Sequence, residues 1–380
     1  MYSIPATYWL SLFFITFYST WGIFLPFWGA WLSSNGISSE NIGLLFTLGL
    51  VLRFVSSLSL LSKVSSAKSI LRLLRILIFC NLIAFSCLLF TQGELWMAVL
   101  TLVINFAIGP LMPLGDIVGI RLVNQIGIDY GRVRLLGSVS FIIGSTVVGW
   151  LIVANGEQAI LWSIVFLVLI MWLLSLLNLT PKLQEQPKAV NEPKTSLWSL
   201  FKKRDVLIFL VIIGAIQGSH GAFYAFGTIY WSEVGLSGAS IAGLWAIGVA
   251  AEVILMRFNI KLFKSWSIKQ MLLLGVIAAI LRWLVFAGTD NFYILAFIQT
   301  FHAFTFAVTH LAAIRYISFQ KDNEIVLYQS LYSGVALGLM MAIFTYVAGF
   351  FYEDLKGGVF LIMSLSLLPI LGFIKIWKVE

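Results

Sequence analysis

The sequence predicts an all-α membrane protein in which twelve transmembrane helices form two pseudo-symmetric six-helix halves. The first observation is composition: 60% of the 380 residues are hydrophobic and 11% are charged, whereas soluble globular chains carry about 25% charged residues. The second is that apolar runs of about 20 residues, enough to cross a bilayer, nearly fill the chain. The third is that basic residues gather in alternate loops, as in membrane proteins whose basic loops face the cytoplasm.

The apolar runs are expected to be helices, because in lipid every backbone N–H and C=O must be paired within its own segment. In the first half they cover about residues 7–31, 41–62, 72–90, 95–122, 135–153 and 158–178. In the second half they cover about 206–231, 241–262, 268–287, 292–316, 328–350 and 357–376. Pro110 and Pro113 are expected to kink the fourth run, and residues 123–134 are expected to form a loop before the fifth.

A polar segment divides the chain into three parts. Residues 179–205 hold three prolines and six basic residues, a composition typical of a linker. We therefore expect an N-terminal bundle over 1–178, a cytoplasmic linker over 179–205 and a C-terminal bundle over 206–380. Within the linker, Leu197–Phe201 is expected to form a short amphipathic segment.

The net charge of +8 does not indicate a nucleic-acid partner, because the basic residues are confined to alternate loops. The intervening loops are mostly acidic. This positive-inside pattern predicts a multi-pass protein in a lipid bilayer with both termini and the linker in the cytoplasm.

The second half resembles the first in sequence. Adding 199 to a residue number in the first two runs matches Gly22 with Gly221 and Phe27 with Phe226, and it sets Arg53 opposite Glu252. In the fourth and tenth runs an offset of 194 sets the residues Asp116 and His310 opposite each other. Two related six-helix halves are the plan of transporters that bind their substrate near the bilayer midplane, between the halves.

Ionisable side chains inside the runs are costly and usually face a water-filled cavity or a proton pathway. For proton coupling or gating the candidates are Asp116, Glu252, His302, His310 and Arg53. For substrate binding they are Tyr18, Trp21, Asn105, Asp116, Arg134, Gln217, His220, Tyr224, Arg282 and His302. Gln217, His220 and Tyr224 share one helical face, and the 199 offset maps Tyr18 and Trp21 onto the same stripe.

Structural alternatives remain open for these groups. Arg53 and Glu252 could pair and hold helices together. Asp116 could neutralise Arg121 or Arg134 in the same way. Either histidine of the tenth run could be an interhelical hydrogen-bond partner.

Enzyme signatures are missing from the sequence: it contains no HExxH, CxxC, GxSxG or Walker A motif. We therefore expect no enzymatic activity, no metal site and no cofactor. Without an ATP site, uphill transport must use an ion gradient, and the protonatable groups favour H⁺ as the coupling ion.

Four strings resemble the major facilitator superfamily: Gly22–Trp28, Pro113–Asp116, Asp129–Ser138 and Leu311–Ile317. Within it, the chain is similar to bacterial 3-phenylpropionate permeases, in the wider group of lactose permease and nucleoside–proton symporters. The lactose permease pattern has a substrate-binding acid and arginine, which Asp116 and Arg134 match. Its ninth-span arginine and tenth-span histidine are matched by Arg282 and His302. The proton-carrying glutamate of that pattern is replaced by Thr305, and Glu252 stands about a turn from its eighth-span acid.

The resemblance implies proton-coupled uptake of a small aromatic carboxylate across a bacterial inner membrane. Arg282 or Arg134 would hold the carboxylate, and Trp21 and Tyr224 would hold the ring. The alternatives are a proton symporter for a sugar or nucleoside, and a membrane sensor that transports nothing. We expect a monomer, because the fold needs no partner.

Overall fold

The computed structural model confirms the twelve predicted spans. It describes residues 3–61, 63–64, 66–184, 197–321 and 324–377. Within this part of the chain, twelve helical segments are long and apolar enough to cross a membrane. Each overlaps one predicted run, because the requirement for paired backbone groups in lipid acts on every run separately.

The first six spans are formed by seven helices. They are α1 (Ala6–Ser34), α2 (Ser39–Leu61), α3 (Ala67–Leu88), α4 (Glu94–Ile108), α5 (Leu111–Ile126), α6 (Tyr130–Asn155) and α7 (Gln158–Ser175). The fourth span is divided between α4 and α5 at Gly109 and Pro110, where the sequence predicts a kink. Proline lacks the N–H that would continue the α-helical ladder.

The expectation of a loop over residues 123–134 was wrong, because only residues 127–129 lie outside the helices. α5 continues to Ile126 and α6 already begins at Tyr130. The carboxylate of Asp129 accepts a hydrogen bond from the backbone N–H of Arg132 (3.0 Å) and so caps the helix. As a result, Arg134 lies in the first turns of α6 and not in a flexible connection.

Among the described residues, the last six spans include two π-helical segments. The helices are α9 (Arg204–Gly218), α10 (His220–Glu233), α11 (Gly238–Phe263), α12 (Ile268–Gly288), α13 (Phe292–Gln299), α14 (Thr309–Ser318), α15 (Ile325–Leu331), α16 (Met340–Leu355), α17 (Gly358–Ser366) and α18 (Leu368–Ile376). The π-helical segment η1 (Ala303–Val308) lies in the tenth span, and η2 (Tyr332–Leu339) lies in the eleventh. Such π turns are rare and often occur at functional sites.

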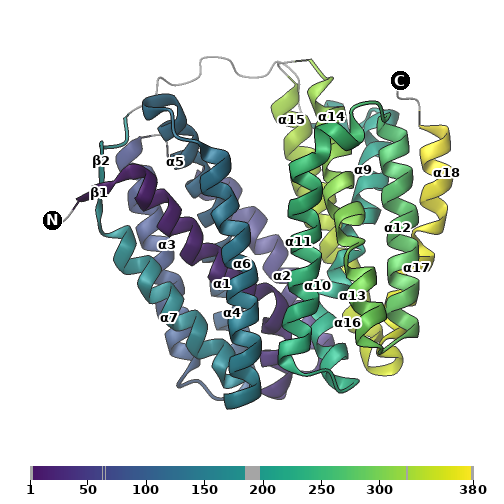
Figure 1. Ribbon diagram of the computed structural model, residues 1–380, viewed down its shortest axis with the longest axis horizontal. Helices are drawn as coiled ribbons and strands as arrows, with labels where there is room; N and C mark the ends of the chain where they lie inside the picture. Colours follow the sequence, from purple (N-terminus) through teal and green to yellow (C-terminus); the bar gives the residue numbers. More distant parts are fainter. Residues whose placement is uncertain (1–2, 62, 65, 185–196, 322–323, 378–380) are drawn as a thin grey trace. The chain divides into compact units, whose positions relative to one another are not determined.

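Two short strands lie at the ends of spans in the first part of the chain. β1 (Ser3–Pro5) precedes α1, and β2 (Asn178–Thr180) follows α7. The strands pair in parallel, with Ile4 opposite Leu179 (Figure 1). They fix the start of α1 to the chain that leaves α7.

The chain divides into two compact units. The first contains Met1–Ile37, Leu48–Val190 and Ser237–Ala242, and the second contains Ser38–Thr47, Asn191–Leu236 and Gly243–Glu380. The starts of α2 and α11 thus each belong to the other unit, and Ser38 and Ser237 are related by the 199 offset. Residues 185–196 of the predicted linker lie outside the described residues, whereas Leu197–Phe201 forms the helix α8. The division into bundles 1–178 and 206–380 remains a prediction.

Spans 1 and 7 are the most enclosed helices of their units. In their most apolar windows, 72% of the residues of α1 and 89% of those of α9–α10 are buried, against at most 50% in any other span. α1 packs against α6 and α7 (Figure 1). These two spans therefore position the side chains that the sequence predicts to line a site.

α1 and α6 approach each other through glycines. A Cβ at Gly22 would collide with the backbone of Phe141, and a Cβ at Gly144 would collide with the backbone of Ser19. Small residues allow this backbone contact between membrane helices, where packing rather than water exclusion drives association.

Gly144→Ala should destabilise the protein by about 1–3 kcal/mol, because the added methyl group forces the two helices apart. The matched control is Gly372→Ala in α18, where nothing lies within 4 Å of the new Cβ. The control should be neutral or slightly more stable. Thermal unfolding of the two purified variants in detergent checks this, and equal melting temperatures would contradict the proposed contact.

Candidate functional site

The Arg282 guanidinium is fully buried inside the second unit, at 0% exposure. Its Nη2 donates to Oε1 of Gln299 (2.7 Å), and its Nη1 donates to Oγ1 of Thr305 (3.1 Å). Three aromatic rings surround it, with the guanidinium carbon 5.0 Å from the centre of Phe223 and 4.6 Å from that of Trp283. The rings provide cation–π stabilisation for a charge that has left water.

No carboxylate neutralises this guanidinium within the part of the chain that the structure describes. None of the ion pairs among the described residues includes Arg282. Its Nε is also buried without a hydrogen-bond partner among them. A buried charge normally has an ionic partner. Arg282 therefore has the features of a receptor for an anion.

His302 lies between Arg282 and the acid Glu252. Its Nδ1 is 3.1 Å from Nη1 of Arg282. An arginine can only donate, so Nδ1 must accept and the ring proton must be on Nε2. That nitrogen is 3.6 Å from Oε2 of Glu252. The contacts therefore assign a neutral His302 whose N–H is directed at a half-buried carboxylate.

His220 is held in a second neutral tautomer. Its Nδ1 is 3.1 Å from the carbonyl oxygen of Ile216 and therefore donates. Its Nε2 then accepts from the hydroxyl of Thr305 at 3.0 Å. Thr305 thus joins Arg282 to His220, and all three side chains are fully buried.

Aromatic rings form one edge of this group, where Tyr224 is half-buried and Trp245 is buried. Tyr224 stacks on Trp245, with ring centres 6.0 Å apart, and lies 5.9 Å from His220. Gln217, on the preceding turn, donates from Nε2 to the carbonyl oxygen of Phe306 (3.2 Å). The predicted stripe of Gln217, His220 and Tyr224 therefore lies next to Arg282.

Both π-helical segments carry residues of this region. η1 begins directly after His302 and contains Thr305. η2 begins at Tyr332, whose hydroxyl is 2.8 Å from Nδ1 of His310. A π turn changes the angular spacing of side chains, so these contacts cannot be read from a regular helical repeat.

In the first unit, Arg53 lies against the aromatic face of α1. Its guanidinium carbon is 4.8 Å from the ring centre of Trp21, and its Nε donates to Oδ1 of Asn105 (2.7 Å). Asn105 in turn donates to the carbonyl oxygen of Thr101 (2.8 Å). Both arginine and indole are half-buried, so a solute can reach them more easily than it can reach Arg282.

A second polar group in the first unit joins α5 and α6. The hydroxyl of Tyr130 donates to Oδ1 of Asp116 at 2.6 Å. The Arg134 guanidinium lies 4.3 Å from the ring centre of Tyr18. The ion pairs of the described residues do not include one between Asp116 and Arg134. Asp116 and Arg134 therefore remain near each other without neutralising each other directly.

Comparisons with known proteins identify the family of the chain. Residues 7–363 match the MFS_1 like family. The chain belongs to this family, within the major facilitator superfamily. It is 37% identical over 368 residues to the probable 3-phenylpropionic acid transporter of Escherichia coli (strain K12), covering 96% of each chain. It is 25% identical over 276 residues to the maltose permease of Geobacillus stearothermophilus, covering 70% of this chain and 68% of that one.

Among solved structures, the crystal structure of nucleoside transporter NupG has the same fold. It superposes with a TM-score of 0.83 and 17% sequence identity, covering 99% of this chain and 100% of that one. The resemblance to the superfamily and the all-α fold with twelve spans, which the sequence predicts, are thereby confirmed. As a member of this family, the protein is a multi-pass membrane transporter.

The fold places most of the predicted residues in three groups. One lies in the second unit and contains Arg282, His302, His220, Tyr224 and Glu252, with Gln217 beside it. The other two lie in the first unit: one contains Arg53, Trp21 and Asn105, and the other contains Asp116, Arg134 and Tyr18. Asn105 and Asp116, eleven residues apart in the fourth span, belong to separate groups because α4 ends between them.

Sequence reasoning missed Gln299 and Tyr130. Gln299 precedes His302 by three residues, and this spacing could have indicated it. Tyr130 carries no such signal, since its contact with Asp116 depends on how α5 and α6 meet.

Thr305→Val should lower the stability of the second unit. Valine keeps the shape but leaves Arg282 and His220 each without one hydrogen-bond partner, which costs about 1–3 kcal/mol per buried group. Thr300→Val is the matched control, since the hydroxyl of Thr300 bonds only to a carbonyl of its own helix (2.7 Å). Thermal unfolding should separate the two variants by several degrees. Equal melting temperatures of the Thr300→Val and Thr305→Val variants would refute the role assigned to the Thr305 hydroxyl.

Proposed function

We propose that the protein takes up a small aromatic carboxylate, such as 3-phenylpropionate, together with protons by alternating access. The observation that carries this proposal is the fully buried Arg282 guanidinium, which has no ion-pair partner among the described residues. The similarity to the E. coli transporter named for 3-phenylpropionic acid supports the same substrate class. We further propose a monomer in a bacterial inner membrane, with both termini in the cytoplasm and no cofactor or chemical step.

The substrate carboxylate would bind Arg282. Its Nε is the donor left without a partner, and an arginine–carboxylate pair is a strong, charge-assisted contact. The guanidinium is enclosed in the structure, so a substrate would reach it after side chains such as the half-buried Tyr224 or the buried His302 move aside. Arg134, half-buried over Tyr18, is the second candidate for this contact.

The substrate ring would pack on aromatic side chains. Tyr224 and Trp245 form a stacked pair beside Arg282, and Trp21 presents a half-buried indole in the first unit. Offset or edge-on contacts between aromatic rings contribute about 0.5–1.5 kcal/mol beyond the burial of their area. A carboxylate with an aromatic ring therefore satisfies both features of the site.

The proton would bind Glu252 when the substrate binds Arg282. His302 lies between the two groups, with Nδ1 3.1 Å from Nη1 of Arg282 and Nε2 3.6 Å from Oε2 of Glu252. A carboxylate bound to Arg282 would therefore be linked to Glu252 through His302. Binding of substrate and proton would then be reciprocally linked. Asp116 is the alternative carrier, and Arg53 and His310 would have gating roles.

Proteoliposomes that hold the purified protein should accumulate labelled 3-phenylpropionate when the outside is made acidic. Arg282→Gln should abolish accumulation, because a neutral amide cannot pair with the carboxylate. The matched control is Arg257→Gln, at an exposed arginine that lies over Phe258, and it should transport normally. Unchanged uptake in Arg282→Gln would remove this arginine from the site.

Glu252→Gln should separate transport from proton coupling. Without an ionisable group at this position, the variant should exchange labelled for unlabelled substrate but should not accumulate it against a gradient. Counterflow and pH-driven uptake, measured on the same vesicles, check this expectation. Accumulation equal to that of the unmodified protein would assign the proton to another residue, with Asp116→Asn as the next variant.

Competition distinguishes the alternative substrates. Arylpropionates should inhibit uptake, whereas maltose and nucleosides should not. Inhibition by nucleosides would favour nucleoside transport, the activity for which NupG is named. Inhibition by maltose would favour maltose transport, the activity for which the permease is named. Ligand binding without any flux would favour a membrane sensor.

A further inference from the structure

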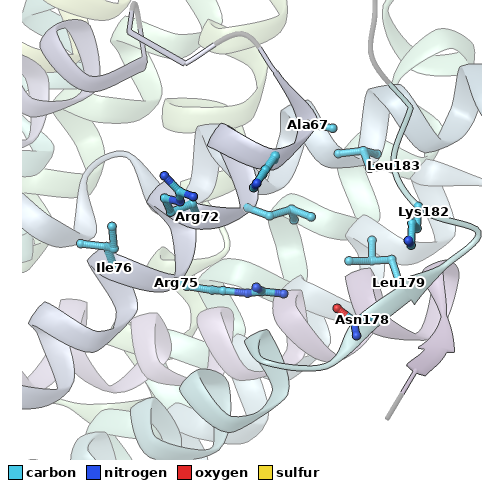
Figure 2. A pocket seen from close by; sticks show the side chains of 10 residues that line it. Ala67, Arg72, Arg75, Ile76, Asn178, Leu179, Lys182 and Leu183 are labelled. Carbon is cyan, nitrogen blue, oxygen red and sulfur yellow. The ribbon is translucent and has the colours of Figure 1, made fainter. Parts of the chain in front are cut away.

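A basic cavity lies in the first unit, away from every group described above. It has a volume of about 590 Å³ and lies between the first turns of α3 and the chain around β2 (Figure 2). This volume is within the range of about 300–1,000 Å³ that is usual for small-molecule sites. Transport as proposed does not use it.

Four basic side chains line the cavity: Lys68, Arg72, Arg75 and Lys182. No acidic residue is among the lining residues, and the ion pairs formed by the described residues include none of the four. Lys68, Arg72 and Lys182 are exposed. The cavity therefore concentrates positive charge that forms no ion pair with the described residues.

The walls of the cavity are held in place by hydrogen bonds. Arg75 donates from Nε to the carbonyl oxygen of Ser175 at 2.7 Å, which joins α3 to the end of α7. The side-chain amide of Gln125 donates to the carbonyl oxygen of Lys182 (2.8 Å). Figure 2 shows Arg75 extending from α3 toward the strand that carries Asn178 and Leu179. Side chains of α3 and of the chain around β2 thus face a common, structured cavity.

The cavity is polar at the end of the spans and apolar along them. Lys68 and Arg72 lie one turn apart near the start of α3, and Ile76 follows one turn further into the span. Ile76 is 51% exposed, and Phe79, one turn beyond it, is 44% exposed, as expected for side chains that face lipid. A ligand that fits both parts has an anionic head and hydrocarbon chains.

We propose that this cavity binds an anionic phospholipid, with its phosphate among Lys68, Arg72 and Lys182 and its acyl chains along Ile76 and Phe79. Arginine and lysine are the side chains that bind phosphate oxygens. The start of α3 adds the positive end of a helix. The location at the end of a span places the bases at the depth of lipid headgroups, which distinguishes a lipid from a soluble anion.

The test measures lipid binding to the full-length protein in detergent by native mass spectrometry. Phosphatidylglycerol should bind at least about tenfold more tightly than phosphatidylcholine. The triple variant Lys68→Gln/Arg72→Gln/Lys182→Gln should bind phosphatidylglycerol roughly a hundredfold more weakly, since each basic residue near a membrane surface contributes severalfold. The control Lys261→Gln/Lys264→Gln/Lys269→Gln removes as much charge elsewhere and should bind as the unmodified protein does.

A charge-conserving variant, Lys68→Arg/Arg72→Lys/Lys182→Arg, should retain binding, which separates loss of charge from loss of structure. Equal weakening in the control variant would show diffuse attraction instead of a site. Full displacement of the lipid by inorganic phosphate would show a site for a soluble anion. Either result, or unchanged binding in the first variant, would overturn the proposal.

Discussion

The structure of the second unit depends on how one buried positive charge is accommodated. Arg282 is enclosed by Phe223, Trp283 and Phe286 and donates to three neutral acceptors. Neutral partners and ring faces offset only part of the cost of removing a guanidinium from water. The tautomer of His302 follows from its contact with this charge, because Arg282 can only donate and Nδ1 must therefore accept. The tautomer of His220 follows from the carbonyl oxygen of Ile216, to which Nδ1 donates.

The two units use cations in different ways. In the first, Arg53 and Arg134 lie on aromatic rings of α1 and remain half-buried. In the second, Arg282 lies behind the aromatic rings and is fully buried. The guanidinium groups of the first unit therefore remain accessible, whereas the Arg282 guanidinium of the second unit is enclosed. An anionic solute would therefore meet the first kind of cation without rearrangement and the second only after side chains move.

The spans could be predicted from sequence because lipid requires each apolar run to satisfy its own backbone, a local condition. The candidate charges could also be predicted, since Arg53, Asp116 and Arg282 are conspicuous inside such runs. Their partners could be predicted only in part. Gln299 and Thr305 meet Arg282 across helices, and η1 changes the register between them. The start of α6 was misplaced because the cap formed by Asp129 outweighs the polarity of the segment around it.

The close approach of α1 and α6 has a mechanical consequence. At Gly22 and Gly144 the two backbones meet directly, with no side chain between them that could flex and absorb a displacement. A displacement of α1 at Trp21 would therefore also displace α6, the helix that carries Arg134. Trp21, which contacts Arg53, and Arg134 on α6 are thus linked through the direct backbone contact between α1 and α6.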